Sequence, residues 1–274
     1  MRTSKKNRVI LTIINILVCF IIISPLLYAL SLSFMSQGEI TQYPPKLLPS
    51  EPNLQNYQHA LNSVPLFRFI FNSFIVSIMV TIGQVFTSSL AAYAFAFYEF
   101  KYKRLLFLMV LSTMMIPAET TVISNFLTVS SWGWNDSLQV LIVPFLTSAM
   151  GIFLIRQFYL TIPKELSEAA KMDGCGTLRF LIKILIPISR PAIASLAIYT
   201  FINTWNQYLW PLLTINNGQN RTVQIGISML QFAEGSNYGV VLAGAILILV
   251  PSIFVFIVGQ KSLVQGMTAG SIKG

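Results

Sequence analysis

The sequence predicts an all-α membrane protein with six transmembrane helices and with both termini in the cytoplasm. Of its 274 residues, 54% are hydrophobic, whereas about 45 to 50% is usual for soluble domains. The mean hydropathy is +0.69, and uncharged runs long enough to cross a bilayer, about 20 residues each, recur along the chain. Basic residues gather in alternate connecting segments, a pattern that sets the orientation of membrane helices.

The first span is predicted at 9–37, after a basic cytoplasmic segment at 1–8. It is longer than the apolar core of a cleaved signal peptide, about 7 to 15 residues, so we expect it to remain as a helix. A polar, proline-rich extracytoplasmic loop follows at 38–68, with a short amphipathic helix at 54–62. The second span, 69–98, is rich in serine and alanine, which let neighbouring helices approach closely.

The other four spans are predicted at 105–129, 138–159, 192–213 and 239–259. Between the fourth and fifth lies a charged loop of 161–191, which must lie outside the bilayer because charged groups are costly in hydrocarbon. A polar loop is expected at 214–238, and a cytoplasmic tail at 260–274. Glu119 lies near the outer end of the third span, where we expect an interfacial carboxylate, with a proton or cation relay as the alternative.

The net charge of +9 supports this topology. Only three of the 18 Lys and Arg residues fall in segments assigned to the outside, namely Lys46, Arg68 and Arg221. Nucleic-acid binding would need a cluster on one solvated face, whereas these residues form short blocks between apolar runs. The charge pattern is therefore the positive-inside bias of a membrane protein.

Catalytic chemistry is not expected of this chain. His59 is the only histidine, and Cys19 and Cys175 fall in the first span and the charged loop, so neither a metal site nor a disulfide is predicted. The phosphate-binding motif of P-loop ATPases is absent from the sequence, so we expect no ATP hydrolysis by this chain and no cofactor bound to it.

The charged loop has the composition of two helices joined by a tight turn. Glu168, Ala169 and Ala170 suit a helix that docks in a groove, and Asp173 with Gly174 suits the turn. An amphipathic helix on the membrane surface is the alternative. The second helix is predicted to pack through an apolar face of Leu178, Leu181, Ile182 and Leu185.

The order of residues in this loop resembles a known family. The stretch EAAKMDGCGTLRFLIKILIP, residues 168–187, is similar to the EAA loop of permease subunits of binding-protein-dependent ABC importers, with Ile186 where leucine is usual. Resemblance to the carbohydrate-uptake subfamily, which includes the smaller maltose permease subunit, extends over nearly the whole chain. Residues 204–217 and 221–230 look most similar to the glycerol-3-phosphate permease branch.

The resemblance implies a set of partners in a bacterial or archaeal plasma (inner) membrane. These are a second homologous permease, two ATPase subunits that bind ATP and Mg, and an extracytoplasmic solute-binding protein. The EAA loop would be the coupling helix, with Glu168, Ala169, Ala170, Asp173 and Gly174 at the ATPase contact. By the same resemblance the 260–274 tail would reach the ATPase dimer interface, and 214–238 would approach the binding protein.

We therefore predict a permease subunit of an ABC importer for a sugar or a glycerol-3-phosphate-type solute. Trp205, Asn206 and Trp210 are candidates for the solute pathway because aromatic faces and amides suit sugar hydroxyls, although tryptophan is also an interfacial anchor. A phosphate ester would need a cationic partner as well. The alternatives are a secondary transporter driven by an ion gradient and a membrane scaffold that transports nothing. The identity of the solute, the partner permease and the ATPase is left open.

Overall fold

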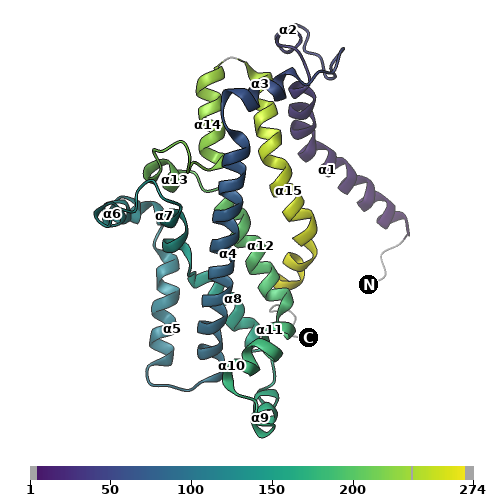
Figure 1. The fold of residues 1–274 in the computed structure, drawn as a ribbon. Helices are drawn as coiled ribbons and strands as arrows, with labels where there is room; N and C mark the ends of the chain where they lie inside the picture. Colours follow the sequence, from purple (N-terminus) through teal and green to yellow (C-terminus); the bar gives the residue numbers. More distant parts are fainter. Residues whose placement is uncertain (1–4, 236, 269–274) are drawn as a thin grey trace. The chain divides into compact units, whose positions relative to one another are not determined.

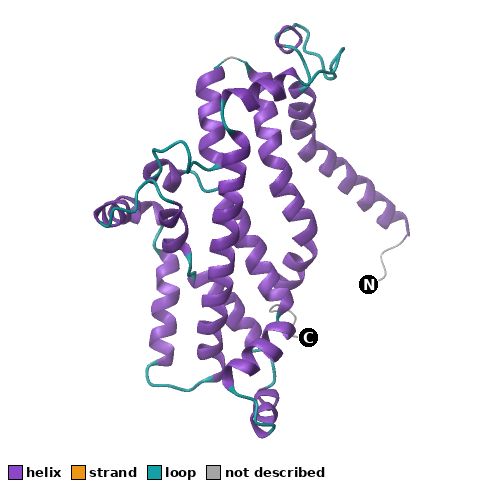
Figure 2. Ribbon diagram, viewed as in Figure 1, coloured by secondary structure: helices purple, strands orange, loops and turns teal. Residues whose placement is uncertain are grey.

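The computed structural model describes residues 5–235 and 237–268, and the regular secondary structure in these ranges is entirely helical (Figure 2). Three helices are long and apolar enough to cross a membrane individually: α1 (Lys5–Ser33), α4 (Leu66–Phe97) and α15 (Tyr238–Thr268). The all-α membrane class is thus confirmed. Helix α1 already begins at Lys5 and α15 continues to Thr268, so both extend into the segments predicted as tails.

Three further pairs of helices are each apolar enough to form one bent span, which raises the count of spans to as many as six. The pair at Lys103–Met115 and Ala118–Ser131 bends by 97°, that at Leu138–Phe145 and Ala149–Tyr159 by 41°, and that at Thr177–Ile188 and Arg190–Trp205 by 81°. The helices concerned are α5 (Lys103–Ser112), η1 (Thr113–Met115), α6 (Ala118–Ser131), α7 (Leu138–Ile142), η2 (Val143–Phe145), α8 (Ala149–Tyr159), α10 (Thr177–Phe180), η3 (Leu181–Leu185), α11 (Ile186–Ile188) and α12 (Arg190–Trp205).

The third span, predicted at 105–129, is not a single helix. The helical run stops at Ile116, whose backbone is extended at φ −88° and ψ 115°, and α6 restarts after Pro117. Proline has no N–H to donate and disfavours helical backbone at the residue before it. The chain therefore turns sharply at this point, and α6 takes a new direction (Figure 1).

The fifth predicted span and the loop after it also differ from expectation. Helix α12 ends at Trp205, and the short helix α13 (Leu209–Thr214) follows a break. The segment expected to be a polar loop contains the helix α14 (Val223–Glu234), with Val223, Ile225 and Leu230 buried. These apolar residues form one packing face of the helix. The helix was not predicted because the segment as a whole is polar.

The remaining helices are short: α2 (Gln37–Ile40), α3 (Gln55–Ser63) and α9 (Lys164–Met172). Helix α3 confirms the amphipathic helix predicted at 54–62. By density of contacts the chain divides into two compact units. The first contains the residues up to Phe67 with Gly226–Val250, and the second contains Arg68–Ile225 with the residues from Pro251 on.

In the first unit, polar side chains hold the segment between α1 and α3. The amide of Asn56 donates to the carbonyls of Ser33 and Met35 at 3.0 and 2.8 Å. Glu39 completes a capping box with Ser36 at the start of α2 and accepts the backbone N–H of Ser50 at 2.9 Å. These bonds close the proline-rich loop on itself.

The loop should be sensitive to acid through Glu39. Hydrogen bonds from Ser50, followed by weaker effects, lower the pKa of this carboxyl from its ordinary 4.5 to about 2. A depressed carboxyl pKa stabilises the folded loop fully above pH 4.5, and that contribution is lost as the pH falls toward 2. We expect resistance of 37–50 to proteolysis to fall between these values, whereas Glu39→Gln should make the loop susceptible already at neutral pH. Equal resistance of both proteins at every pH would contradict this role.

In the second unit, small residues allow close helix packing. Gly151 of α8 lies against Ser88 of α4, and a Cβ at this glycine would stand 2.5 Å from the Ser88 Oγ and 3.1 Å from Leu196 Cδ2. No side chain fits there without displacing a neighbour. This agrees with the serine- and alanine-rich surface predicted for the second span.

Gly151→Val should therefore destabilise the second unit, by about 1 to 3 kcal/mol as overpacked cores do. The thermal unfolding midpoint of the detergent-solubilised protein would measure this, with Gly38→Val as the control because nothing lies within 4 Å of a Cβ at Gly38. Equal midpoints for the two variants would show that α8 and α4 pack less tightly than the structure indicates.

Candidate functional site

The candidate site is the polar helix α9 and the turn that ends it, which lie in the second unit at the end where α4 finishes (Figure 1). Pro163 precedes α9 with φ −57°, which suits the entry into a helix. Glu165 stands in its first turn and Lys171 in its last. Each charge opposes the partial charge of the nearer helix end and so stabilises a helix only nine residues long.

Gly174 ends α9 in a two-bond C-terminal cap. Its backbone has φ +71°, in the left-handed region, and its N–H donates to the Lys171 carbonyl at 3.0 Å. The N–H of Cys175 donates to the Ala170 carbonyl at 2.8 Å. This pair of bonds is a Schellman motif, which favours glycine at the left-handed position. The tight turn predicted at this glycine is confirmed.

One face of α9 packs inward. Ser167 and Ala170 are 8% and 7% exposed, and Leu166 is half-buried. Ala170 belongs to a hydrophobic cluster that joins α9 to α4, α8, the helices after the turn and α12. Its buried members are Ala92, Tyr93, Ala96, Ile155, Tyr159, Ile162, Ala170, Phe180, Leu181, Leu185 and Leu196. Through Ala170, α9 is thus in one apolar cluster with side chains of α4, α8 and α12.

The opposite face of α9 is exposed to solvent. It carries Glu168, Ala169 and Met172, and the exposed surface continues through Asp173 and Gly174. Met172 has 88% of its surface exposed. Of the residues predicted for the ATPase contact, the structure therefore brings Glu168, Ala169, Asp173 and Gly174 to one exposed surface, and turns Ala170 toward the interior of its own chain.

Sequence reasoning missed Met172. A methionine amid charged residues could have signalled a contact surface, because its flexible, polarizable side chain suits protein interfaces. The sequence signal for an interface was a single methionine in the last turn of an otherwise polar helix.

The apolar face predicted after the turn was half wrong. Leu181 and Leu185 are buried, but Leu178 and Ile182 are 64% and 56% exposed. The segment Leu181–Leu185 forms a π-helical turn, in which the Ile186 N–H reaches the Leu181 carbonyl. A π turn takes more residues than an α turn and shifts the buried face along the sequence, so a 3.6-residue period fails there. Phe180 and Ile184 pack in place of the two exposed residues.

The three pathway candidates have different surroundings. Trp205 is 1% exposed and stacks on Phe201 with a centroid distance of 5.7 Å, so it forms part of the packed interior of this subunit. Asn206 is exposed, and its Oδ1 accepts from Gln224 Nε2 at 3.2 Å. Trp210 donates its indole N–H to the Val140 carbonyl at 2.9 Å.

The Trp210 side chain lines two pockets of the second unit. One has a volume of about 500 Å³ and includes Asn125, Thr128, Trp132 and Trp134. The other, of about 260 Å³, has more polar residues. Asn125, Phe145 and Trp210 line both pockets, and the smaller one adds Ala118, Glu119, Thr121, Val122, Gln207, Tyr208 and Leu209. Sequence reasoning predicted Trp210 for the solute pathway, and Glu119 only as an interfacial carboxylate or an ion relay. It missed Asn125, which lies on α6 and lines both pockets.

Two loops of the second unit are joined through Asp136. Its carboxylate accepts the backbone N–H groups of Asn216 and Asn217, and its own N–H donates to the Thr214 carbonyl at 2.9 Å. Arg221, one of the two arginines predicted to lie outside, donates to the Asn216 carbonyl at 3.0 Å. These hydrogen bonds fix the loop after α6 to the loop after α13.

Long apolar helices and three bent helix pairs, with a polar capped helix between two of the pairs, define the class of protein, a polytopic membrane protein. Residues 84–268 match the family model described as "Binding-protein-dependent transport system inner membrane component". The chain belongs to this family, and it is a transport permease of the inner membrane.

Curated relatives agree over nearly the full length. The chain is 36% identical over 269 residues to the "sn-glycerol-3-phosphate transport system permease protein UgpE" of Agrobacterium fabrum, covering 95% of each chain. Identity to the protein of the same name from Rhizobium meliloti is 36%, over 90% of this chain and 91% of that one. For the Escherichia coli protein it is 34%, over 96% and 98%.

A solved structure has the same fold. It is described as the "crystal structure of a bacterial ABC transporter involved in the import of the acidic polysaccharide alginate". One chain of it matches with a TM-score of 0.84 at 24% identity, over 95% of this chain and 99% of that one. These comparisons confirm the resemblance that the EAA loop indicated.

Proposed function

We propose that this permease imports a glycerol-3-phosphate-type solute or a sugar, with ATP hydrolysis on partner subunits as the source of energy. The support for the solute class is the identity of about a third, over nearly the whole chain, to permeases named for sn-glycerol-3-phosphate transport. The pocket of about 500 Å³ lined by three tryptophans offers the aromatic surfaces that polyols and sugars stack on.

The exposed surface of Glu168, Ala169, Met172, Asp173 and Gly174 is the contact for an ATPase subunit in this proposal, and α9 is the coupling helix. The observation that carries it is the two-faced geometry of α9. One face is exposed, and the other is part of the cluster that reaches α4, α8 and α12. Closure of the ATPase subunits on ATP and Mg would push this helix and switch the spans between inward-open and outward-open forms. Ala170 has the different role of anchoring α9 to that cluster.

The proposed topology has six spans, with each bent pair counted as one, and with α9 and both termini in the cytoplasm. The positive-inside distribution supports it, since Lys46, Arg68 and Arg221 are the only basic residues left outside. The partners are a second homologous permease, two ATP-binding subunits and an extracytoplasmic solute-binding protein. The predicted ATPase contact of the tail includes residues 269–274, which lie outside the described residues.

Uptake by proteoliposomes that contain the whole assembly tests the function. With ATP inside and binding protein outside, radiolabelled sn-glycerol 3-phosphate should accumulate, and an ionophore that dissipates ion gradients should leave the rate unchanged. Uptake that stops with the ionophore while ATP is maintained would instead identify a secondary transporter. If a neutral disaccharide accumulates and the phosphate ester does not, the proposed solute is wrong, whereas the ATP-driven mechanism stands.

A further inference from the structure

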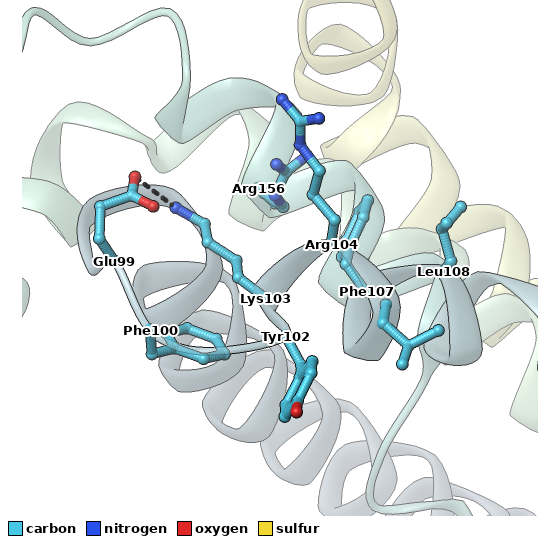
Figure 3. Close-up of a pocket in the computed structure, with 9 residues that line it drawn as sticks. Glu99, Phe100, Tyr102, Lys103, Arg104, Phe107, Leu108 and Arg156 are labelled. Atoms are coloured by element: carbon cyan, nitrogen blue, oxygen red, sulfur yellow. Dashed lines mark hydrogen bonds and ion pairs between the residues drawn. The ribbon is translucent and has the colours of Figure 1, made fainter.

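A pocket at the end of the second unit that holds α9 is lined by three cations. It lies where α4 passes into α5 and has a volume of about 800 Å³. Its charged lining residues are Glu99, Lys103, Arg104 and Arg156 (Figure 3). The apolar side of the lining consists of Phe100, Tyr102, Leu105, Phe107 and Leu108.

The carboxylate in the pocket forms an ion pair with only one of the cations. Lys103 pairs with Glu99 (Figure 3), with Nζ 3.0 Å from Glu99 Oε1. It also donates to the Tyr98 carbonyl at 2.8 Å. Lys103 lowers the pKa of the Glu99 carboxyl, which therefore remains ionised. Within the described residues, neither Arg104 nor Arg156 has an acidic side chain within ion-pair distance. Two guanidinium groups thus line one pocket without an ion-pair partner in the described part of the chain, although the Glu99 carboxylate also interacts with Arg104 over a longer distance.

Arg156 is fixed in place instead of extending freely into solvent. Its side chain is half-buried, its Nε donates to the Phe95 carbonyl at 3.2 Å, and its guanidinium lies 4.1 Å from the centroid of the Phe107 ring. A flexible basic residue at the end of a span would extend toward water. The position of Arg156 is that of a preorganised binding group, because packing and one hydrogen bond have already restricted its rotamers.

The start of α5 adds a second, independent attraction for an anion. Lys103 and Arg104 occupy its first turn, and no acidic residue does. Cations at the N-terminus of a helix oppose its dipole, whereas an anion there is stabilised by the dipole and by backbone N–H groups. The ten-residue helix α5 is therefore short of negative charge at the end that borders the pocket.

We propose that this pocket binds a phosphate group through the guanidinium groups of Arg104 and Arg156. Arginine suits phosphate because its planar fork can donate two parallel hydrogen bonds. Two sources carry this group, the headgroup of an anionic membrane lipid and a free phosphate ester. The apolar side of the pocket favours the lipid, because the exposed Leu105 and Leu108 offer a surface for acyl chains beside the charged groups. The inference does not depend on which solute the permease carries.

Native mass spectrometry of the purified full-length chain tests this site. In neutral detergent, the chain should retain phosphatidylglycerol in preference to phosphatidylcholine. Arg104→Gln and Arg156→Gln should each weaken retention of phosphatidylglycerol about tenfold, the loss expected for one charge-assisted contact. Lys183→Gln is the matched control, since it removes an exposed basic residue of the same unit that does not line the pocket.

Arg156→Gln also removes the packing contact with Phe107, so this variant could be unstable. In that case Arg104→Gln decides the result, because the Arg104 side chain is exposed. A second arm titrates sn-glycerol 3-phosphate and inorganic phosphate in the absence of lipid. If the free phosphate compounds bind to the wild type and not to Arg104→Gln, the phosphate site is supported and its ligand is the free ester. The proposal would be overturned if free phosphate does not bind and the lipid arm also fails. The lipid arm fails if both lipids are retained equally, or if Lys183→Gln weakens retention as much as the arginine variants do.

Discussion

Gly174→Pro is expected to abolish uptake while the protein still reaches the membrane. Proline requires φ near −65°, whereas this position has φ +71°, and the substitution also removes the N–H that donates to the Lys171 carbonyl. Even alanine in the left-handed region costs about 1 to 2 kcal/mol. The C-terminal cap of α9 would be lost, and the exposed surface of Glu168 and Met172 would no longer be held in a fixed orientation.

Gly176→Ala is the control for this variant. Gly176 lies two residues further along the same turn, but its φ of −69° suits any residue and nothing lies within 4 Å of a Cβ there. Uptake rates and membrane levels of both variants should be measured in cells that express the complete transporter. Normal transport by Gly174→Pro, at normal protein level, would show that the orientation of α9 is irrelevant.

The second large effect is expected from Glu168→Lys. The Glu168 side chain is exposed on the outer face of α9, so reversing its charge should leave the fold of this chain intact. At an ATPase contact, however, reversal would place like charges together or leave a partner charge unpaired, which costs several kcal/mol at an interface. Uptake should fall by at least about tenfold, the change that about 1.4 kcal/mol produces.

Glu168→Gln keeps the shape of the side chain and removes only its charge, so its uptake should lie between the wild type and Glu168→Lys. Solute-stimulated ATP hydrolysis of the purified assembly separates a coupling defect from a folding defect. We expect hydrolysis and transport to fall together in Glu168→Lys, with no change in the thermal unfolding midpoint. A lowered midpoint would indicate instead that the residue stabilises its own chain.

The sequence predicted α9 and its turn because their signals are local. A glycine after a polar helical run is a strong stop signal, and Gly174 does occupy the left-handed cap position. The sequence could not show which face of α9 is buried. Ala169 and Ala170 are identical in type and adjacent in sequence, and only packing in the cluster that contains Tyr93 and Phe180 decides which of the two is buried.

The errors arose where the helical period changes or the chain bends. A π turn at Leu181–Leu185 exposed Ile182, which an uninterrupted α-helix would have buried with Leu185. The bend at Pro117 was available in the sequence, since proline is a known helix breaker, but apolar composition was given more weight there. Helix α14 was missed because its apolar residues lie between polar stretches at 216–222 and 234–237, which made the segment as a whole polar.

The central claim is that the exposed face of α9 contacts an ATP-binding subunit, and crosslinking from Met172 tests it most directly. The Met172 side chain is 88% exposed, so a photoreactive amino acid in its place should not disturb the fold, and Phe232, which is 87% exposed, offers a control position on the opposite side of the proposed membrane. In the purified intact transporter, the account predicts a crosslink from position 172 to the ATP-binding subunit and none to that subunit from position 232. A crosslink from position 172 to the extracytoplasmic binding protein, or no crosslink to any partner, would contradict it.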